Sequence, residues 1–341
     1  MKILFLTPNR RGLVCIDFWS DLEEAMGKFA ECKWAGNGYK DYINGEKVEQ
    51  TVKRLYGDDY PDWVIIFPTS SIDGDKWKNF RNRTYPYKIA AVTSDIHASR
   101  VLQVGTEGLV AYFRRAKFNA ILMLYDKIGY GKHPYHRINP NCFLNLESKI
   151  CFSPPCINPD VFRPSKKSKI YDVVFLGAVD KRQHPLRYAV WNKLPRFARK
   201  KGWKILLKGR PDGRVRQRVI KQMIKHNYVV GEKYVEVLGR SKIFIFDSSI
   251  YKYPLLKYFE GMACGTCVMA DVPFRADKLH FIPNKNFIEV NLGNWKQKLE
   301  YYLRNNVERE RITECGYQTV LKYHTCETRA RKLVKWLEEN I

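Results

Sequence analysis

No stretch of this sequence approaches the 18 or more consecutive apolar residues that a membrane-spanning helix needs. The opening segment, MKILFLTPNRRG, also lacks the long apolar region and the small-residue cleavage site of a signal peptide. Both absences lead us to expect a cytoplasmic chain. Repeats of solenoid length and low-complexity tracts are missing too, so the sequence favours ordinary globular domains.

Acidic residues are scarce. The 341 residues include 35 Asp and Glu against 60 Lys and Arg, a net charge of +25, which predicts attraction to nucleic acid, acidic glycans or anionic membrane. Between Lys181 and Lys225 there are 16 basic residues and one acid. A solvated helix face normally carries acids that balance its charge, and here they are missing. The candidate polyanion-binding residues are Arg210, Arg214, Arg216, Arg218 and Lys221.

The nine cysteines are odd in number and irregularly spaced, which favours reduced, structural thiols over a disulfide framework. Cys264 and Cys267 have the spacing of a redox or zinc-ligand pair. No second such pair and no pair of histidines completes a metal site. We therefore expect no metal ligands in this chain, although a requirement for a divalent ion from solution stays open.

The chain length favours two domains, and short apolar runs separated by amphipathic stretches indicate alternating strands and helices around parallel sheets. This pattern occurs twice. The first series of expected strands covers residues 2–7, 63–68, 88–93 and 120–125, with a helix at 17–30. The second series covers residues 172–176, 203–208, 243–247, 267–270 and 287–290. The predicted fold class is α/β with two sheets.

The segment PPCINPDVFRPSKKSK between the two series has four prolines and continues neither a helix nor a central strand. The sequence therefore predicts one domain over residues 1–165 and a second over 166–324. Near the end of the chain, residues 327–340 space Ala330, Leu333, Val334 and Leu337 as one face of a helix. We assign this terminal helix, about 325–341, to the first domain.

The most informative stretch is PLLKYFEGMACGTCVMAD, which we interpret as a helix beginning at Pro254, a glycine turn and a strand. Lys257 and Glu260 are three residues apart and so share one face near the helix start. A Lys in the first turn opposes the helix dipole unless an anion binds there, and a diphosphate is such an anion. Glu260 is suited to accept hydrogen bonds from ribose hydroxyls. The alternative is an ion pair on a solvated helix.

This stretch resembles the nucleotide-sugar signature of the two-Rossmann (GT-B) glycosyltransferases, whose helical Glu holds the donor ribose. The nearest groups are the spore-maturation type and, more distantly, the bacteriophage DNA β-glucosyltransferases. The resemblance implies two Rossmann-like domains facing across a cleft, with the terminal helix packed back on the first. It also implies that YDVVFLGAVDKR is the first strand and phosphate loop of the donor domain. The further donor-binding residues that it implies are Gly177, Lys181, Arg182, Lys233, Tyr234, Gly265 and Thr266.

Asp95 follows an apolar strand, where ligands bind in open α/β sheets, although an Asp there can also cap the next helix. In IAAVTSDIH it matches the catalytic base of the inverting phage enzymes, and His97 is our second candidate base. Many retaining members carry a Glu eight residues before the ribose Glu, where this chain has Lys252. The resemblance therefore implies an inverting reaction.

The expected function is sugar transfer from a nucleotide sugar, with a UDP sugar favoured, to a hydroxyl acceptor, without a tightly bound cofactor. The basic surface and the phage resemblance make DNA with hydroxymethylated bases the leading acceptor, and a viral chain would act in the host cytoplasm. The alternatives are a cell-surface or spore glycan, lipid or protein acceptor, with contact to an anionic membrane surface, and a nucleic-acid-binding protein without catalysis.

Overall fold

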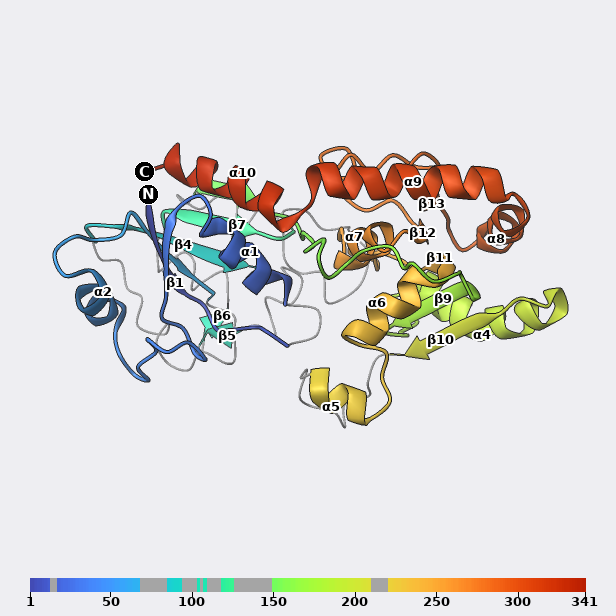
Figure 1. Ribbon diagram of the computed structural model, residues 1–341, viewed down its shortest axis with the longest axis horizontal. Helices are drawn as coiled ribbons and strands as arrows, with labels where there is room; N and C mark the ends of the chain where they lie inside the picture. The colour runs from blue at the N-terminus through green and yellow to red at the C-terminus, as the bar shows by residue number, and fades with distance from the viewer. Residues whose placement is uncertain are drawn as a thin grey trace.

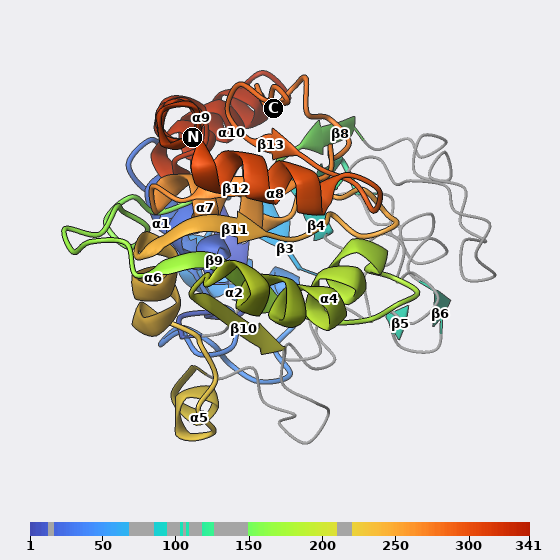
Figure 2. The ribbon, with the colours of Figure 1, turned by 90° about the vertical axis from the view of Figure 1, so that its right-hand side faces the viewer.

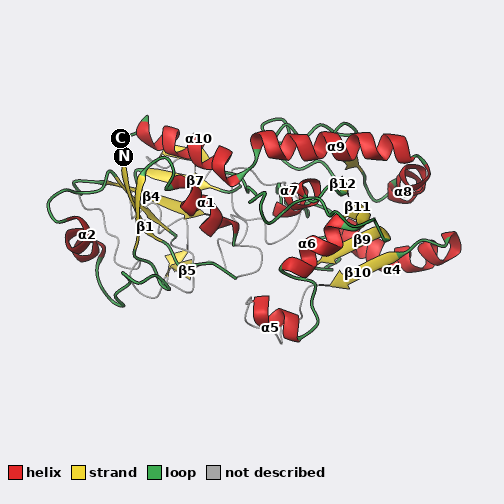
Figure 3. Cartoon of the chain, in the orientation of Figure 1, coloured by secondary structure: helices red, strands yellow, loops and turns green. Residues whose placement is uncertain are grey.

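The computed structural model describes residues 1–12, 17–67, 85–93, 103–104, 107–108, 118–125, 149–209 and 220–341. Strands and helices alternate along the chain in two groups, one at each end of the elongated molecule (Figures 1 and 3). Each group contains a parallel sheet whose central strands are almost entirely buried. This is the pattern of sheets covered by helices on both faces.

The first sheet has six parallel strands in the order β2-β1-β3-β4-β7-β8. Their bounds are β1 Lys2–Leu6, β2 Glu31–Trp34, β3 Trp63–Ile66, β4 Lys88–Thr93, β7 Ala120–Met123 and β8 Lys149–Phe152. Helices α1 (Phe18–Met26) and α2 (Val48–Tyr56) belong to the same half. A short antiparallel pair is formed by β5 (Gln103–Val104) and β6 (Glu107–Gly108).

The second sheet has five parallel strands in the order β10-β9-β11-β12-β13. Their bounds are β9 Tyr171–Gly177, β10 Ile205–Gly209, β11 Ser241–Ile245, β12 Cys267–Ala270 and β13 Ile288–Glu289. The helices of this half are α4 Pro185–Lys201, α5 Ile220–Lys225, α6 Glu232–Gly239, α7 Leu256–Ala263, α8 Trp295–Arg304 and α9 Asn306–Tyr323.

Successive residues of β9 point into different cores, as the period of a strand requires. Val174 packs with residues of α6 and α7, whereas Val173 and Phe175 pack with residues of α4 and α8. Figure 2 shows α4 and α8 on the near side of this sheet. The expected strands of both series are therefore confirmed within a few residues, as is the α/β fold with two parallel sheets.

The last helix, α10 (Cys326–Glu338), leaves the second half and packs along α1 of the first (Figure 1). Ala330, Leu333, Val334 and Leu337 join the core of the first half, as their spacing predicts. The Trp63 indole donates to the Leu337 carbonyl at 3.2 Å. The terminal helix therefore packs back on the first sheet, while the proposed boundary at residue 165 stays a prediction.

The chain crosses between the two halves twice, and the two crossings run side by side. The Ile157 amide donates to the His324 carbonyl at 3.0 Å, and the Cys326 amide donates to the Ile157 carbonyl at 2.8 Å. Beside this pair the thiols of Cys156 and Cys326 lie 3.2 Å apart, both buried. A stack of Tyr125 on Tyr253, with ring centroids 4.2 Å apart, adds a further contact between the halves.

Candidate functional site

The start of α7 differs from the sequence interpretation by two residues. Leu255 has extended backbone angles and precedes the helix, so Pro254 lies outside it instead of in its first turn. Pro254 instead lies in a tight turn before the helix, in which the Leu255 amide donates to the Tyr253 carbonyl at 2.8 Å. Lys257 is consequently the second helical residue, and Glu260 still follows one turn later.

Glu260 is buried, with 9% of its surface exposed, and accepts a hydrogen bond of 2.7 Å from the hydroxyl of Tyr234 on α6. Burial raises the pKa of the Glu260 carboxyl, and the Lys257 charge and the Tyr234 hydrogen bond offset this only in part. Two residues expected at the donor site are thus in direct contact. A buried carboxylate with one oxygen held by a neighbour is preorganised to accept hydrogen bonds from a ligand.

The Lys257 ammonium lies against the rings of Phe244 and Tyr234, 5.6 and 5.7 Å from their centroids. Gly177, at the end of β9, faces the same side chain. A Cβ at Gly177 would lie 3.2 Å from Lys257 Cε and 3.5 Å from Arg187 Nη1, and its φ of +143° disfavours any other residue. Two cationic groups therefore converge beside a glycine at the carboxyl ends of the strands.

Arg187, in the first turn of α4, is a candidate site residue that the sequence analysis did not identify. It is buried, its Nε donates to the Asp247 carbonyl at 3.1 Å, and Nε also lies 3.0 Å from Asp247 Oδ1. Burial lowers the pKa of Arg187, and Asp247 opposes that shift. A signal existed, since Arg187 shares a helix face with the apolar Val190 and Leu194, an unusual place for an arginine without a partner.

Asp247, just after β11, also binds the start of α4. Its Oδ2 accepts from the amides of Leu186 and Arg187 at 3.0 and 3.2 Å, and its Oδ1 lies 2.9 Å from His184 Nδ1. Burial favours a raised pKa for Asp247, but the His184 hydrogen bond and the Arg187 charge outweigh it, so the pKa is lowered. The carboxylate is therefore charged at neutral pH.

The loop that joins β9 to α4 is held by Asp180. Its carboxylate accepts from the amides of Arg182 and Gln183 at 2.7 and 2.8 Å. The side chains of Lys181 and Arg182 are exposed, and the Lys181 ammonium lies 5.9 Å from the Tyr188 ring centroid. Both cations consequently stand on the loop that begins at Gly177, at the same edge of the sheet as Lys257.

Lys252 is anchored by a carboxylate. Its ammonium lies 2.5 Å from Asp271 Oδ2, while the amide and hydroxyl of Ser248 bind the same carboxylate. The residue has a positive φ of 56°, which is uncommon for a lysine. The ammonium of Lys252, eight residues before Glu260 in the sequence, is thus paired with a carboxylate.

Three other expected donor residues have different contacts. Lys233, in the first turn of α6, pairs with Glu236 at 2.9 Å and is largely exposed. Gly265 and Thr266 follow the opposite end of α7, where the Gly265 carbonyl accepts from Lys169 and the Thr266 hydroxyl donates to the Leu238 carbonyl. Within the part of the chain that the structure describes, none of these three residues forms a hydrogen bond or ion pair with the carboxylate of Glu260.

Several expected site residues lie outside the described residues, namely Asp95, His97, Arg210, Arg214, Arg216 and Arg218. Lys221 is described and is exposed on α5. On the same short helix Met223 is buried, whereas Ile224 is 53% exposed.

Cys264 and Cys267 are free, buried thiols that pack into different cores. Cys264 packs with residues of α6 and α7, and Cys267 packs with residues of α4 and α8. Burial raises the pKa of the Cys267 thiol to about 12. In the part of the chain that the structure describes, no group of three or more His, Cys, Asp or Glu side chains is arranged to hold a metal ion.

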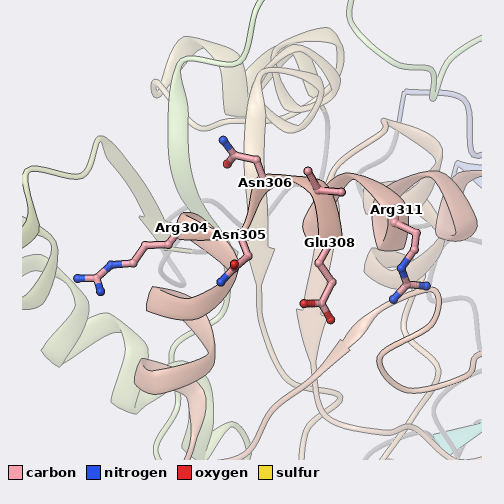
Figure 4. Close-up of a pocket in the computed structure, with 6 residues that line it drawn as sticks. Arg304, Asn305, Asn306, Glu308 and Arg311 are labelled. Carbon is pink, nitrogen blue, oxygen red and sulfur yellow. The ribbon is translucent and has the colours of Figure 1, made fainter.

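A separate hollow lies at the junction of α8 and α9, lined by Arg304, Asn305, Asn306, Val307, Glu308 and Arg311. Figure 4 shows Arg304 and Arg311 pointing to different sides, with Glu308 between them. Val307 is 87% exposed there, and Glu308 accepts from Tyr301 at 2.8 Å. None of these residues belongs to the cluster around Glu260, so the hollow has no part in that site.

Residues 175–335 match the family model described as glycosyl transferase-like. This span contains the whole cluster of Gly177, Arg187, Tyr234, Lys257 and Glu260. The chain carries a glycosyltransferase domain. A comparison with curated protein sequences gives no match.

Solved structures establish the fold around this glycosyltransferase domain. An α-glucosyltransferase in complex with UDP and a 13-mer DNA containing an HMU base is 13% identical, with a TM-score of 0.66 and 99% of each chain covered. Sucrose-phosphate synthase from Thermosynechococcus elongatus is 14% identical, with a TM-score of 0.62 and 99% of this chain and 98% of that chain covered. The HepE protein of Anabaena, in complex with UDP and glucose, is 11% identical, with a TM-score of 0.59 and 99% of each chain covered. The glycosyltransferase therefore has the GT-B fold.

The match begins within β9 and ends within α10, so it covers the rest of the second sheet together with Lys257 and Glu260. Among the described helices of this glycosyltransferase, none is long and apolar enough to cross a membrane.

Proposed function

We propose that the protein transfers a sugar from a nucleoside diphosphate sugar, with UDP as the favoured nucleotide, to a hydroxyl group of a polyanionic acceptor. The observation that carries this proposal is the cluster at the carboxyl ends of β9 and β11. Lys257 and Arg187 converge on Gly177, and the Glu260 carboxylate lies one helical turn from Lys257. The cations suit a diphosphate, and the carboxylate suits the hydroxyls of a ribose.

The chemistry requires charge stabilisation on the departing nucleotide. As the bond between the sugar carbon and the phosphate oxygen breaks, its electron pair passes to the diphosphate. Lys257 and Arg187, with Lys181 and Arg182 on the adjoining loop, supply fixed positive charge at that place. These residues meet the demand without a metal ion, so we propose no metal requirement.

We further propose that the reaction inverts the sugar carbon and that Asp95 is the base. Asp95 accepts the proton of the acceptor hydroxyl while the hydroxyl oxygen bonds to the sugar carbon. In the second half, Lys252 supports this choice, because its ammonium on Asp271 puts a cation where a retaining mechanism would use a carboxylate. His97 is the second candidate for the base.

Hydroxymethylated bases in DNA are the acceptor that we favour. The excess of basic residues between Lys181 and Lys225 and the exposure of Lys221 suit a phosphate backbone. The similar α-glucosyltransferase was solved with a DNA that contains such a base. A base inside a duplex would have to flip out, at a cost of a few kcal/mol that backbone contacts offset.

The test combines donor turnover and transfer. The purified protein is incubated with UDP, GDP and dTDP sugars, with duplex DNA that contains or lacks hydroxymethylated bases. We expect release of the nucleoside diphosphate from one donor class and transfer of labelled sugar only to the modified DNA. Release without transfer to DNA would reject the acceptor, and no release from any donor would reject the enzyme function.

Two further measurements separate the parts of the proposal. The logarithm of the DNA binding constant should fall with the logarithm of the salt concentration, with a slope of about −0.9 for each phosphate neutralised. A slope near zero would reject DNA as the acceptor.

Asp95→Ala should bind the donor normally and lose transfer. Unchanged transfer by that variant would reject Asp95 as the base.

A further inference from the structure

His184 is anchored at one ring nitrogen only. Its Nδ1 lies 2.9 Å from Asp247 Oδ1, and the other Asp247 oxygen accepts the amides of Leu186 and Arg187. Because the Asp247 carboxylate is charged, Nδ1 carries a hydrogen and donates it. Nε2 is then a bare acceptor in the neutral ring, and it makes no hydrogen bond to any described residue.

The ring stands where the loop from β9 enters α4. His184 is the residue before the helix, Pro185 is the first helical residue, and 13% of the histidine side chain is exposed. The Ile250 amide donates to the Gln183 carbonyl at 2.9 Å, which joins this loop to the one that follows β11. His184 and Arg187 share Asp247, and Arg187 Nη1 faces Gly177 and Lys257. Nε2 therefore belongs to the same edge of the sheet as the proposed diphosphate site.

The surroundings of the imidazole act on its pKa in opposite directions, and burial has the largest effect. Burial and the charge of Arg187 on α4 oppose the protonated ring, whereas Asp247 after β11 and Asp180 in the loop favour it. The balance lowers the pKa of His184, so the ring is neutral in the free protein at neutral pH. A diphosphate beside it would add negative charge without adding a competing cation, and this favours the protonated ring.

We propose that His184 takes up one proton when the nucleoside diphosphate binds and that Nε2–H then donates to a phosphate oxygen. The proton comes from solvent and returns to solvent when the nucleotide leaves. Asp247 is a positioning residue, since it holds Nδ1 and directs Nε2 at the ligand. This inference depends on the proposed function, because it requires a nucleotide at the edge formed by Gly177 and Lys257.

Calorimetry of nucleotide binding tests the proposal. UDP, GDP and dTDP are titrated at about pH 7.5 into the full-length protein in Tris and in HEPES, whose ionisation enthalpies differ. The binding enthalpy of the nucleotide that binds should differ between buffers by the amount expected for proton uptake. His184→Asn should lose this uptake, and its affinity should lose the rise toward lower pH, which for one linked proton is up to about tenfold per pH unit.

His226→Asn is the matched control, because His226 is an exposed histidine outside the cluster, and it should keep the proton uptake of the wild type. Thermal unfolding of each variant verifies that it folds. If His184→Asn does not fold, Asp247→Asn replaces it and should shift the midpoint of the pH-dependent affinity to lower pH. Equal proton uptake by the wild type and His184→Asn overturns the inference while UDP binding stands. No binding of any of the three nucleotides overturns the proposed function and this inference together.

Discussion

The hydroxyl of Tyr234 on α6 donates to Glu260 Oε2 on α7 at 2.7 Å, and this hydrogen bond fixes the buried carboxylate in one orientation. The Lys257 ammonium lies over the same tyrosine ring, 5.7 Å from its centroid. One aromatic side chain therefore contacts both the carboxylate and the cation. Its position explains how two oppositely charged groups on one helix face stay separated and available to one ligand.

Tyr234→Phe should weaken nucleotide binding about fivefold, because a typical hydrogen bond contributes about 1 kcal/mol. Glu260→Ala should weaken it at least tenfold, since hydrogen bonds to a charged group contribute about 1.5 to 3 kcal/mol. Isothermal titration calorimetry with UDP measures both effects. Lys242→Ala is the control, because Lys242 lies at the start of β11, at the opposite end of that strand from the site, and pairs with Asp172; this variant should bind UDP as the wild type does. Unchanged affinity in Glu260→Ala would contradict this assignment.

Without ligand, Glu260→Gln should become more stable relative to the wild type as pH rises. Burial raises the folded-state pKa of Glu260 above its ordinary value of 4.5, so the stability contributed by the protonated carboxyl is present below that pH and is lost as pH rises through the folded pKa. Gln does not titrate and keeps its contribution. The melting temperature of the variant relative to the wild type should therefore increase between about pH 4.5 and neutral pH. A constant difference would show that Glu260 has the same pKa in both states.

Gly177→Ala should lose nucleotide binding. The added methyl carbon would meet Lys257 Cε at 3.2 Å, and the φ of +143° is strained for alanine, so both the ammonium and the loop must move. Gly209→Ala, at the end of the neighbouring β10, meets nothing closer than Trp191 at 3.7 Å and serves as the control. UDP titrations and melting temperatures of both variants distinguish a lost site from a lost fold. Normal UDP binding by Gly177→Ala would contradict the close approach of Lys257.

Mild oxidation should join Cys156 to Cys326. Their thiols are 3.2 Å apart and 170 residues apart in the sequence, and closure of so long a loop stabilises a protein by about 5 kcal/mol in the chain-entropy estimate. Non-reducing electrophoresis and melting temperature monitor the bond, which Cys326→Ser should abolish. Cys315→Ser, on α9, should keep it. Absence of a bond in the wild type after treatment with copper phenanthroline would contradict the proximity of the two thiols.

The strands found from sequence are those with continuous runs of buried Val, Ile and Phe. Lys88–Thr93 and Cys267–Ala270 have the predicted bounds, because both are buried on two faces and flanked by polar residues. Glu31–Trp34 and Lys149–Phe152 were missed. Both are edge strands with a charged first residue and only part-buried side chains, so no apolar run marks them.

The candidate site was predictable in part. The spacing of Lys257 and Glu260 along one helix indicates a shared face, and the structure puts Tyr234 against both. Arg187 and Asp247 could not be paired from sequence, because they are 60 residues apart and meet only when α4 packs beside the end of β11. His184 joins them for the same reason, since tertiary contacts and not local patterns select its partner.

A crystal structure of the protein with UDP tests the central claim most directly. We predict both ribose hydroxyls within hydrogen-bonding distance of the Glu260 carboxylate, and the diphosphate between Lys257, Arg187 and the loop that begins at Gly177. A nucleotide bound elsewhere, with Glu260 and Lys257 free of contact to it, would contradict the account.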